Sequence, residues 1–201
     1  GSEMCIRDSN KDTIKKIVEI YNEILLDILD IDKDDERLTA FVFERENVYR
    51  VKAITKDGIH ILYPHIVTPP EVQYYVRDCV LKKIVPILDE LPLTNKPYDV
   101  VDRSVIRDTN WLLYGSSKLN IDPYQLSGIY NSKLDEISIN DYEFNMNIAQ
   151  FFSIRNKKDS DLTHIKSDKQ SLLENINIKK KNIRIKRKNI IVDDYEEITK
   201  L

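Results

Sequence analysis

The stretch Lys56-Asp57-Gly58-Ile59-His60 combines a cation, a glycine and a histidine at a spacing that could bind an anion. Residues two apart in a strand share one face, so Gly58 and His60 are expected to project to the same side, with Lys56 where the turn leaves the sheet. A glycine beside a histidine leaves room for a bulky anion such as a triphosphate. An ordinary hairpin glycine followed by a half-buried histidine is the alternative.

A second stretch, Val100-Val101-Asp102, places a carboxylate directly after a short apolar run. If the run is a strand, the backbone is fixed while the aspartate stays at the rim, an arrangement suited to holding a divalent metal ion. Aspartate is also a favoured capping residue at the start of a helical turn. The residue pattern alone leaves both roles of Asp102 open.

A third stretch runs from Asn110 to Lys118 and contains a strand-like segment followed by Gly115-Ser116-Ser117-Lys118. A strand that feeds such a turn offers backbone N–H groups, hydroxyls and a lysine, which together could bind a phosphate-sized anion. Trp111 and Tyr114 could stack on a base, although aromatic residues in strands commonly belong to the core.

The charge of the chain is unevenly distributed. Residues 1–150 carry a net charge of −8 and residues 151–201 a net charge of +5, and seven of the ten residues in KKKNIRIKRK at 179–188 are basic. The pattern predicts an acidic folded part and a basic tail. Such a tail could be a solvated linker, or it could bind nucleic-acid backbone without sequence preference.

Composition excludes several classes of protein. The chain has only four glycines, so neither a GxxxxGK phosphate loop nor a GxGxxG dinucleotide fingerprint can be assembled. Two cysteines, Cys5 and Cys79, are too few for a disulfide framework or a four-cysteine zinc site, which favours a reducing compartment. The sequence has no run of about 18 apolar residues that could span a membrane.

Periodicity predicts the elements that must position these stretches. Apolar residues at spacings of three and four predict a helix over 12–29, capped by Ser9, Asn10 or Asp12. A second helix is expected over 71–91 after two prolines, with a kink at Pro86. β-branched and aromatic residues predict strands at 39–43, 48–54, 59–63, 98–101, 111–114, 124–131 and 136–139. The first two strands are expected to form a hairpin, and the last two to pair.

Mixed helices and antiparallel strands indicate an α+β fold, with a folded domain expected over residues 10–152. Residues 1–9, GSEMCIRDS, resemble translated adaptor sequence and are left out of the fold prediction, which implies that natural N-terminal residues are missing. Residues 153–201 lack the apolar volume for a core, so a disordered basic linker or tail is expected there.

The order of several motifs resembles the archaeo-eukaryotic primase domain found in primase-helicases of poxviruses and giant DNA viruses. A more distant resemblance is to primase-polymerases of the PrimPol type. The resemblance covers about residues 12–155 and rests on the following stretches: KDGIHILYP, EVQYYVRD, VVDRSVIRDTNWLLYGSSK, PYQLSGIY and FFSIR. It implies a primase-like core with an RRM-like sheet flanked by helices, and a nucleotidyltransferase that synthesises primers on single-stranded DNA.

The resemblance also assigns roles to individual residues. Gly58-Ile59-His60 falls on a motif whose histidine contacts the phosphates of the incoming nucleotide, and Lys56 falls on a phosphate-binding lysine. Asp102 matches a metal-binding aspartate, and Ser116-Ser117-Lys118 matches a turn whose lysine faces the triphosphate. Leu112 stands where PrimPol-type enzymes carry an arginine, so one nucleotide or template contact is missing from the pattern.

Two divalent metal ions, Mg²⁺ or Mn²⁺, held by three carboxylates are implied for the intact enzyme. The acidic pair that joins the third carboxylate in the family precedes the first helix, whereas Asp30-Ile31-Asp32 follows it. We therefore expect the acidic pair to lie upstream of this chain, and this fragment to be inactive.

The implied partners are a single-stranded DNA template, nucleoside triphosphates and a helicase domain of the same polypeptide. The implied location is an intracellular viral replication compartment in the host cytoplasm or nucleus, without a membrane partner. A non-catalytic module that binds single-stranded nucleic acid is the alternative, as is an inactive piece that links a helicase to partners.

Overall fold

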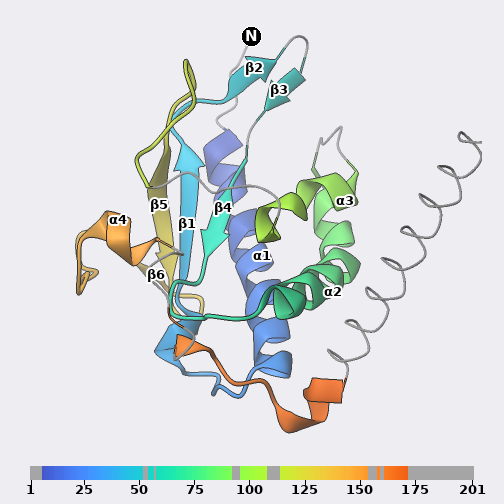
Figure 1. Cartoon of the computed structure of the whole chain (residues 1–201). Helices are drawn as coiled ribbons and strands as arrows, with labels where there is room; N and C mark the ends of the chain where they lie inside the picture. Colours follow the sequence, from blue (N-terminus) through green and yellow to red (C-terminus); the bar gives the residue numbers. More distant parts are fainter. Residues whose placement is uncertain are drawn as a thin grey trace, which may run out of the picture. The chain divides into compact units, whose positions relative to one another are not determined.

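The computed structural model divides the chain into two units, Gly1–His164 and Ile165–Leu201. The structure describes residues 6–51, 54–56, 58–91, 96–107, 114–153, 158 and 161–171. The described part of the second unit contains a 3-10 helix, η5 (Ser167–Lys169). The first unit combines helices with an antiparallel sheet, which confirms the predicted α+β class (Figure 1). Most of the expected basic tail, residues 172–201, lies outside the described residues.

The first helix, α1 (Ile6–Ile28), confirms the predicted amphipathic segment and begins several residues earlier than expected. Ile14 and Val18 are buried in the core, as their spacing of four on one face of a helix requires. The residues that were expected to cap the helix instead lie within it, and they are Ser9, Asn10 and Asp12.

A four-stranded antiparallel sheet forms the centre of the first unit, in the strand order β4-β1-β5-β6 (Figure 1). Its strands are β1 (Ala40–Arg45), β4 (His60–Leu62), β5 (Tyr124–Tyr130) and β6 (Glu136–Ile137). The first four residues of β1 are buried, as expected for a strand with a neighbour on each side and packing on both faces. The antiparallel pairing of β5 with β6 confirms the predicted closing pair.

The predicted hairpin between residues 39–43 and 48–54 is wrong. β1 pairs with β4 and β5, which occupy both of its edges. β2 (Tyr49–Val51) instead pairs with β3 (Ile54–Lys56) in a separate two-stranded sheet. The unbroken apolar run in β1 is typical of a central strand, and such a strand has no open edge for the segment that follows it.

Side chains cover both faces of the four-stranded sheet. On one face, Val42 and Tyr130 pack with the buried residues of α1. On the other face, Phe41 and Phe43 pack with Phe151 of α4 (Ile148–Phe151) and with further aromatic residues that follow the sheet in the sequence. We term this second face the aromatic face.

α2 (Pro70–Asp89) confirms the second predicted helix and continues through Pro86. The strand predicted over 98–101 is wrong, because α3 (Pro97–Val100) is a single helical turn there. Pro97 favours a helix start, and a short apolar run does not distinguish a strand from a helix. A 3-10 turn, η2 (Ser104–Ile106), comes next. Residues 111–113 of another predicted strand lie outside the described residues, and Tyr114 begins a turn.

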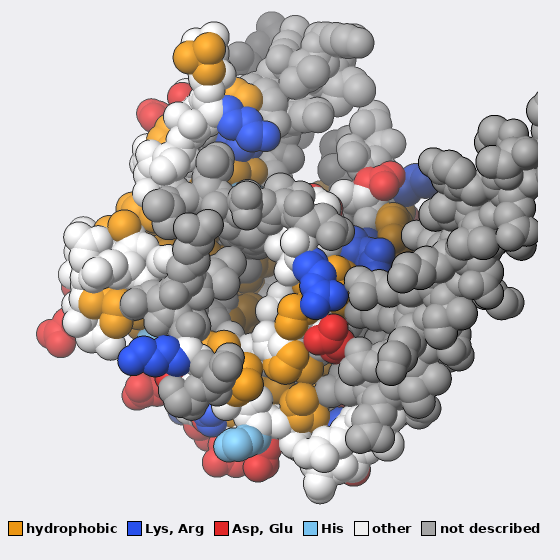
Figure 2. Space-filling model, in the orientation of Figure 1, with side chains coloured by type: hydrophobic (Ala, Val, Ile, Leu, Met, Phe, Trp, Pro, Cys, Tyr) orange, Lys and Arg blue, Asp and Glu red, His pale blue; other side chains and the backbone are white. Residues whose placement is uncertain are grey.

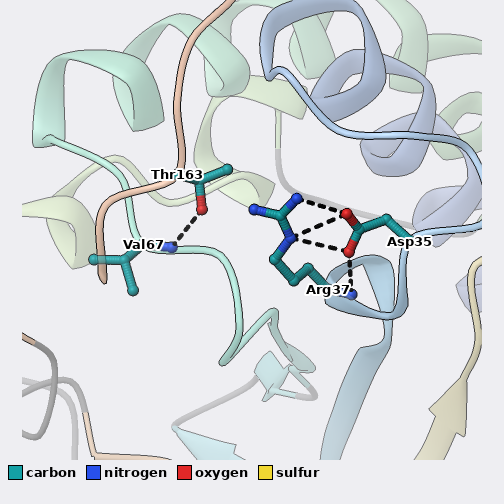
Figure 3. Close-up of polar contacts among 4 residues, drawn as sticks. All are labelled: Asp35, Arg37, Val67 and Thr163. Atoms are coloured by element: carbon teal, nitrogen blue, oxygen red, sulfur yellow. Dashed lines mark hydrogen bonds and ion pairs between the residues drawn. The ribbon is translucent and has the colours of Figure 1, made fainter. Parts of the chain in front are cut away.

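Two pairs of residues form polar contacts that stabilise loops of the first unit (Figure 3). Asp35 forms an ion pair with Arg37, with 2.6 Å between Oδ2 and Nη2, at the start of η1 (Glu36–Leu38). The amide of Val67 donates to Thr163 Oγ1 at 3.3 Å, and the Thr163 amide donates to the Val67 carbonyl at 2.8 Å. Thr163 is buried, so the folded unit includes residues beyond the expected boundary at residue 152.

None of the helices in the described part of the chain is long and apolar enough to cross a membrane.

Candidate functional site

His60 is the first residue of the edge strand β4 and lies on the aromatic face of the sheet. It pairs in register with Phe43 of β1, and its ring stacks on Tyr124 of β5, with centroids 3.8 Å apart and 25° between the planes. Gly58 faces the same tyrosine, since a Cβ on Gly58 would lie 3.1 Å from the Tyr124 hydroxyl. Gly58 and His60 therefore project to the same side, as predicted, but the tyrosine hydroxyl takes the space beside the glycine that was assigned to an anion.

Arg45, at the end of β1, adds a cation to this group. Its Cζ lies 3.9 Å from the centroid of the Tyr124 ring, and its Nη1 donates to the Tyr124 hydroxyl at 2.9 Å. Its Nε donates to the Asp122 carbonyl at 3.0 Å, which fixes the direction of the side chain. We term Arg45, Gly58, His60 and Tyr124 the His60 cluster.

A β-bulge in β5 places Tyr124 on the aromatic face. The register between β1 and β5 shifts between Val42 and Phe43, which makes Ser127 the extra residue in β5. Because side chains alternate between the faces of a sheet, one extra residue moves the segment before it to the opposite face. Without the bulge, Tyr124 would project toward α1 and away from His60.

The His60 cluster combines a neutral imidazole with a positive charge. Burial, followed by the charge of Arg45, lowers the pKa of His60 from its ordinary value of 6.5 to about 4. The imidazole is therefore neutral at pH 7 and carries one ring N–H that can donate a hydrogen bond. An anion bound beside the cluster would be attracted by the charge of Arg45 and could accept a hydrogen bond from His60.

The Gly-Ser-Ser-Lys turn begins on the same face of the sheet. Tyr114 packs edge-on against Phe43, the register partner of His60, with ring centroids 6.0 Å apart. Gly115 follows with a φ of +79°, a left-handed conformation that favours glycine. Residues 116–118 are exposed beyond it. The structure therefore brings the start of this turn and His60 to one region of the sheet.

Two other parts of the predicted site are not brought next to His60 in the described structure. Lys56 is the last residue of β3 and pairs with Tyr49, so its backbone belongs to a different sheet from His60. Residues 108–113, which include Trp111 and Leu112, fall outside the described residues.

Asp102 lies between α3 and η2, not at the end of a strand as one interpretation of the sequence required. Its Oδ1 accepts a hydrogen bond from the Ser104 amide at 2.8 Å, and its Oδ2 accepts one from the Ser104 hydroxyl at 3.0 Å. The N-cap of η2 is Arg103, so Asp102 forms an Asx-type turn with Ser104 and is not the helix cap that the sequence also allowed. The two hydrogen bonds hold an exposed carboxylate in one orientation.

A pocket of about 650 Å³ is lined by residues of the edge strand β4 and of α2. The wall includes Asp102 as well as Ile61 and Leu62, the two residues that follow His60. Most of the lining is apolar, and Figure 2 shows hydrophobic side chains at the surface between the sheet and α2, next to acidic and basic ones. Asp102 therefore shares a pocket with the strand that carries His60.

The described residues do not build the two-metal centre that the resemblance implies. In the part of the chain that the structure describes, no three Asp, Glu, His or Cys side chains come together where they could hold a metal ion. Asp30 and Asp32 lie in the exposed loop after α1. Asp102 is a single carboxylate, and one carboxylate is too few ligands for an all-protein cation site.

Sequence reasoning missed Arg45 and Tyr124 as site residues. Tyr124 belongs to the stretch PYQLSGIY, but its face depends on the bulge, which the alternation pattern does not reveal. A cation two residues after the apolar run AFVF is the signal that could have indicated Arg45, since a charge at the end of a central strand lies at the rim of the sheet.

Comparison with known proteins agrees with the motif pattern. Residues 5–130 match the family described as "C962R protein N-terminal AEP domain". "Putative helicase L207/L206" of Acanthamoeba polyphaga mimivirus is 36% identical over 128 residues, which are 62% of this chain and 13% of that protein. "Putative helicase 184R" of Invertebrate iridescent virus 6 is 30% identical over 105 residues, which are 48% of this chain and 10% of that protein. No solved structure matches the chain.

Proposed function

The chain belongs to the family of C962R protein N-terminal AEP domains, and from this premise we propose that it is part of a DNA primase that synthesises primers on single-stranded DNA in viral DNA replication. The family match confirms the archaeo-eukaryotic primase family predicted from the sequence. Both relatives carry helicase names and are much longer than this chain. We therefore also propose that a helicase domain lies in the same polypeptide.

The His60 cluster, beside the start of the Gly-Ser-Ser-Lys turn, is the observation that carries this proposal. A neutral imidazole, a fixed guanidinium and an exposed turn with two hydroxyls and a lysine offer donors and charge to a nucleoside triphosphate. In this proposal His60, Ser116, Ser117 and Lys118 bind phosphate oxygens, and Gly58 lets Tyr124 support the histidine. The role of Lys56 follows from the resemblance alone.

Asp102 is proposed as one carboxylate ligand for Mg²⁺ or Mn²⁺. No group of three possible metal ligands occurs within the described residues, so we propose nucleotide binding for this chain and the complete transfer reaction for the full-length polypeptide. The pocket beside Asp102 and β4 offers apolar walls to the nucleoside part of a substrate or to a template base.

A non-catalytic module that binds single-stranded nucleic acid is the second candidate. It is favoured by the lack of a three-carboxylate cluster in the described part of the chain. Nucleotide incorporation on single-stranded DNA by the full-length polypeptide distinguishes the two, because a binding module would retain the template without extending a primer.

Lys118→Ala is expected to weaken binding of a nucleoside triphosphate to this chain about fivefold, because one charged hydrogen bond to phosphate contributes about 1 kcal/mol at an exposed position. Isothermal titration calorimetry measures the change. Lys133→Ala is the matched control, since Lys133 is also exposed but lies in the turn between β5 and β6, with its Nζ 3.6 Å from Asp34 Oδ1. Equal affinities for the wild-type chain and Lys118→Ala would show that the anion site is wrongly placed.

A further inference from the structure

A nearly buried arginine on α2 holds the backbone that leads into Asp102. The side chain of Arg77 is 4% exposed although it carries a full charge. Its Nε donates to the Val101 carbonyl at 2.7 Å, and its Nη2 donates to the Tyr98 carbonyl at 2.9 Å. Its Cζ also lies 4.3 Å from the centroid of the Tyr98 ring. Arg77 therefore fixes α3 and the residue directly before Asp102.

These contacts use a geometry that is specific to arginine. Burial of a charge costs free energy that hydrogen bonds must offset, and the exposed Asp78 adds a single long contact, 3.4 Å between Arg77 Nη1 and Asp78 Oδ1. The two carbonyls lie at the C-terminal end of α3, where backbone oxygens need donors from outside the helix. A planar guanidinium can serve both carbonyls at once, whereas a lysine ammonium is a point charge on a flexible stem.

α2 also holds the residue that follows Asp102. The Cζ of Arg103 lies 4.6 Å from the centroid of the Tyr74 ring. Tyr74 and Arg77 are three residues apart on α2 and therefore share one face of the helix. In one cation–π contact the arginine, Arg77, is on α2, and in the other the arginine, Arg103, is on the Asp102 segment. Together these contacts attach both sides of Asp102 to the same helix.

We propose, resting on the function proposed above, that Arg77 is a positioning residue which fixes the Val101–Asp102 peptide and so keeps the Asp102 carboxylate in the pocket wall. Its donors reach backbone oxygens of the Asp102 segment, so it acts through Asp102. Ser104 donates to both carboxylate oxygens, and its amide therefore reports on the arrangement that Arg77 maintains.

Amide hydrogen exchange of Ser104 in this chain tests the proposal. Arg77→Met and Arg77→Lys are expected to raise the exchange rate of the Ser104 amide at least about tenfold, because the segment is no longer held on α2. The lysine variant is expected to show the same increase in Ser104 exchange as the methionine variant, because one ammonium group cannot replace the two guanidinium donors. Asp78→Asn removes only the exposed ion pair and should leave the rate unchanged. An unchanged Ser104 rate in the folded Arg77 variants would overturn the proposal.

A control for general destabilisation is available in the same helix. Leu88 is buried at the end of α2, and Leu88→Ala should destabilise the whole unit. At an equal loss of global stability, Ser104 should exchange faster in the Arg77 variants than in Leu88→Ala, and equal rates would contradict a positioning role. If Arg77→Met does not fold, Arg77→Lys decides the question, since it removes the paired donors that hold the Tyr98 and Val101 carbonyls.

Failure of the proposed function gives a different result. In the full-length polypeptide, Arg77→Lys should lower kcat for nucleotide incorporation at least about tenfold with an unchanged KM for the triphosphate, because the His60 cluster is untouched. If Asp102→Ala leaves incorporation intact, the proposed function fails even though Ser104 responds to Arg77. If Asp102→Ala abolishes incorporation while the Arg77 variants alter neither Ser104 exchange nor kcat, the positioning role is overturned and the proposed function stands.

Discussion

Asp102→Ala in the full-length polypeptide is expected to lower nucleotide incorporation on single-stranded DNA at least about 100-fold, a loss of about 3 kcal/mol of transition-state stabilisation. Asp102 is an exposed carboxylate, held in one orientation by Ser104, in the wall of a pocket that also contains residues of β4. The sequence resemblance implies that Asp102 is a ligand of a divalent metal ion, and the described residues contain no cluster of three possible metal ligands. Primer extension with Mg²⁺ or Mn²⁺ measures the effect.

Asp99→Ala is the matched control for this experiment. Asp99 is an exposed carboxylate on α3, three residues before Asp102, and it is not part of the pocket lining. Its removal changes the local charge by the same amount and should leave incorporation within about twofold of the wild type. If Asp102→Ala retained wild-type incorporation, the assignment of Asp102 would be wrong.

Acidification from pH 6.5 to pH 4 is expected to lower the free energy of unfolding by about 1–2 kcal/mol through His60 alone, because the ring is partly exposed and solvent weakens the full effect of its pKa shift. The pKa of His60 is about 4 in the folded protein, against an ordinary value of 6.5. In this pH range the unfolded chain binds a proton that the folded chain does not, so the stability is fully present above pH 6.5 and decreases as the pH falls toward 4. Urea unfolding at a series of pH values measures this dependence.

His60→Gln separates this effect from the titration of carboxylates. Glutamine keeps a polar side chain in β4 but does not titrate, so the variant should lose less stability than the wild type over the same pH range. The difference between the two slopes isolates His60. Identical slopes would contradict a half-buried, neutral imidazole stacked on Tyr124.

Much of the fold could be predicted because single elements carry strong local signals. The apolar spacing in α1 and the proline at the start of α2 define both helices, and the pairing of β5 with β6 follows from two adjacent strand-like runs. The pairing of β1 could not be predicted from adjacency, because a central strand pairs with segments distant in the sequence. α3 could not be predicted for a different reason, because a helix of four residues is too short to show a helical spacing of apolar residues.

Only part of the candidate site could be predicted from the sequence. The shared face of Gly58 and His60 follows from strand alternation, and both meet Tyr124. The position of Tyr124 depends on the bulge at Ser127, and a bulge depends on the partner strand. Arg45 becomes a site residue only through its contacts with Tyr124 and the Asp122 carbonyl, which are 79 and 77 residues away in the sequence.

An NMR titration of this chain with a nucleoside triphosphate tests the central claim most directly. The proposal predicts chemical-shift changes at the amides of Gly58 and His60 and of residues 115–118, and these changes should be weakened in Lys118→Ala. Inorganic triphosphate should compete for the same amides, because the proposed contacts are to phosphate. Shift changes confined to the basic residues 179–188, or none at His60 and the Gly-Ser-Ser-Lys turn, would contradict a nucleotide site on this face of the sheet.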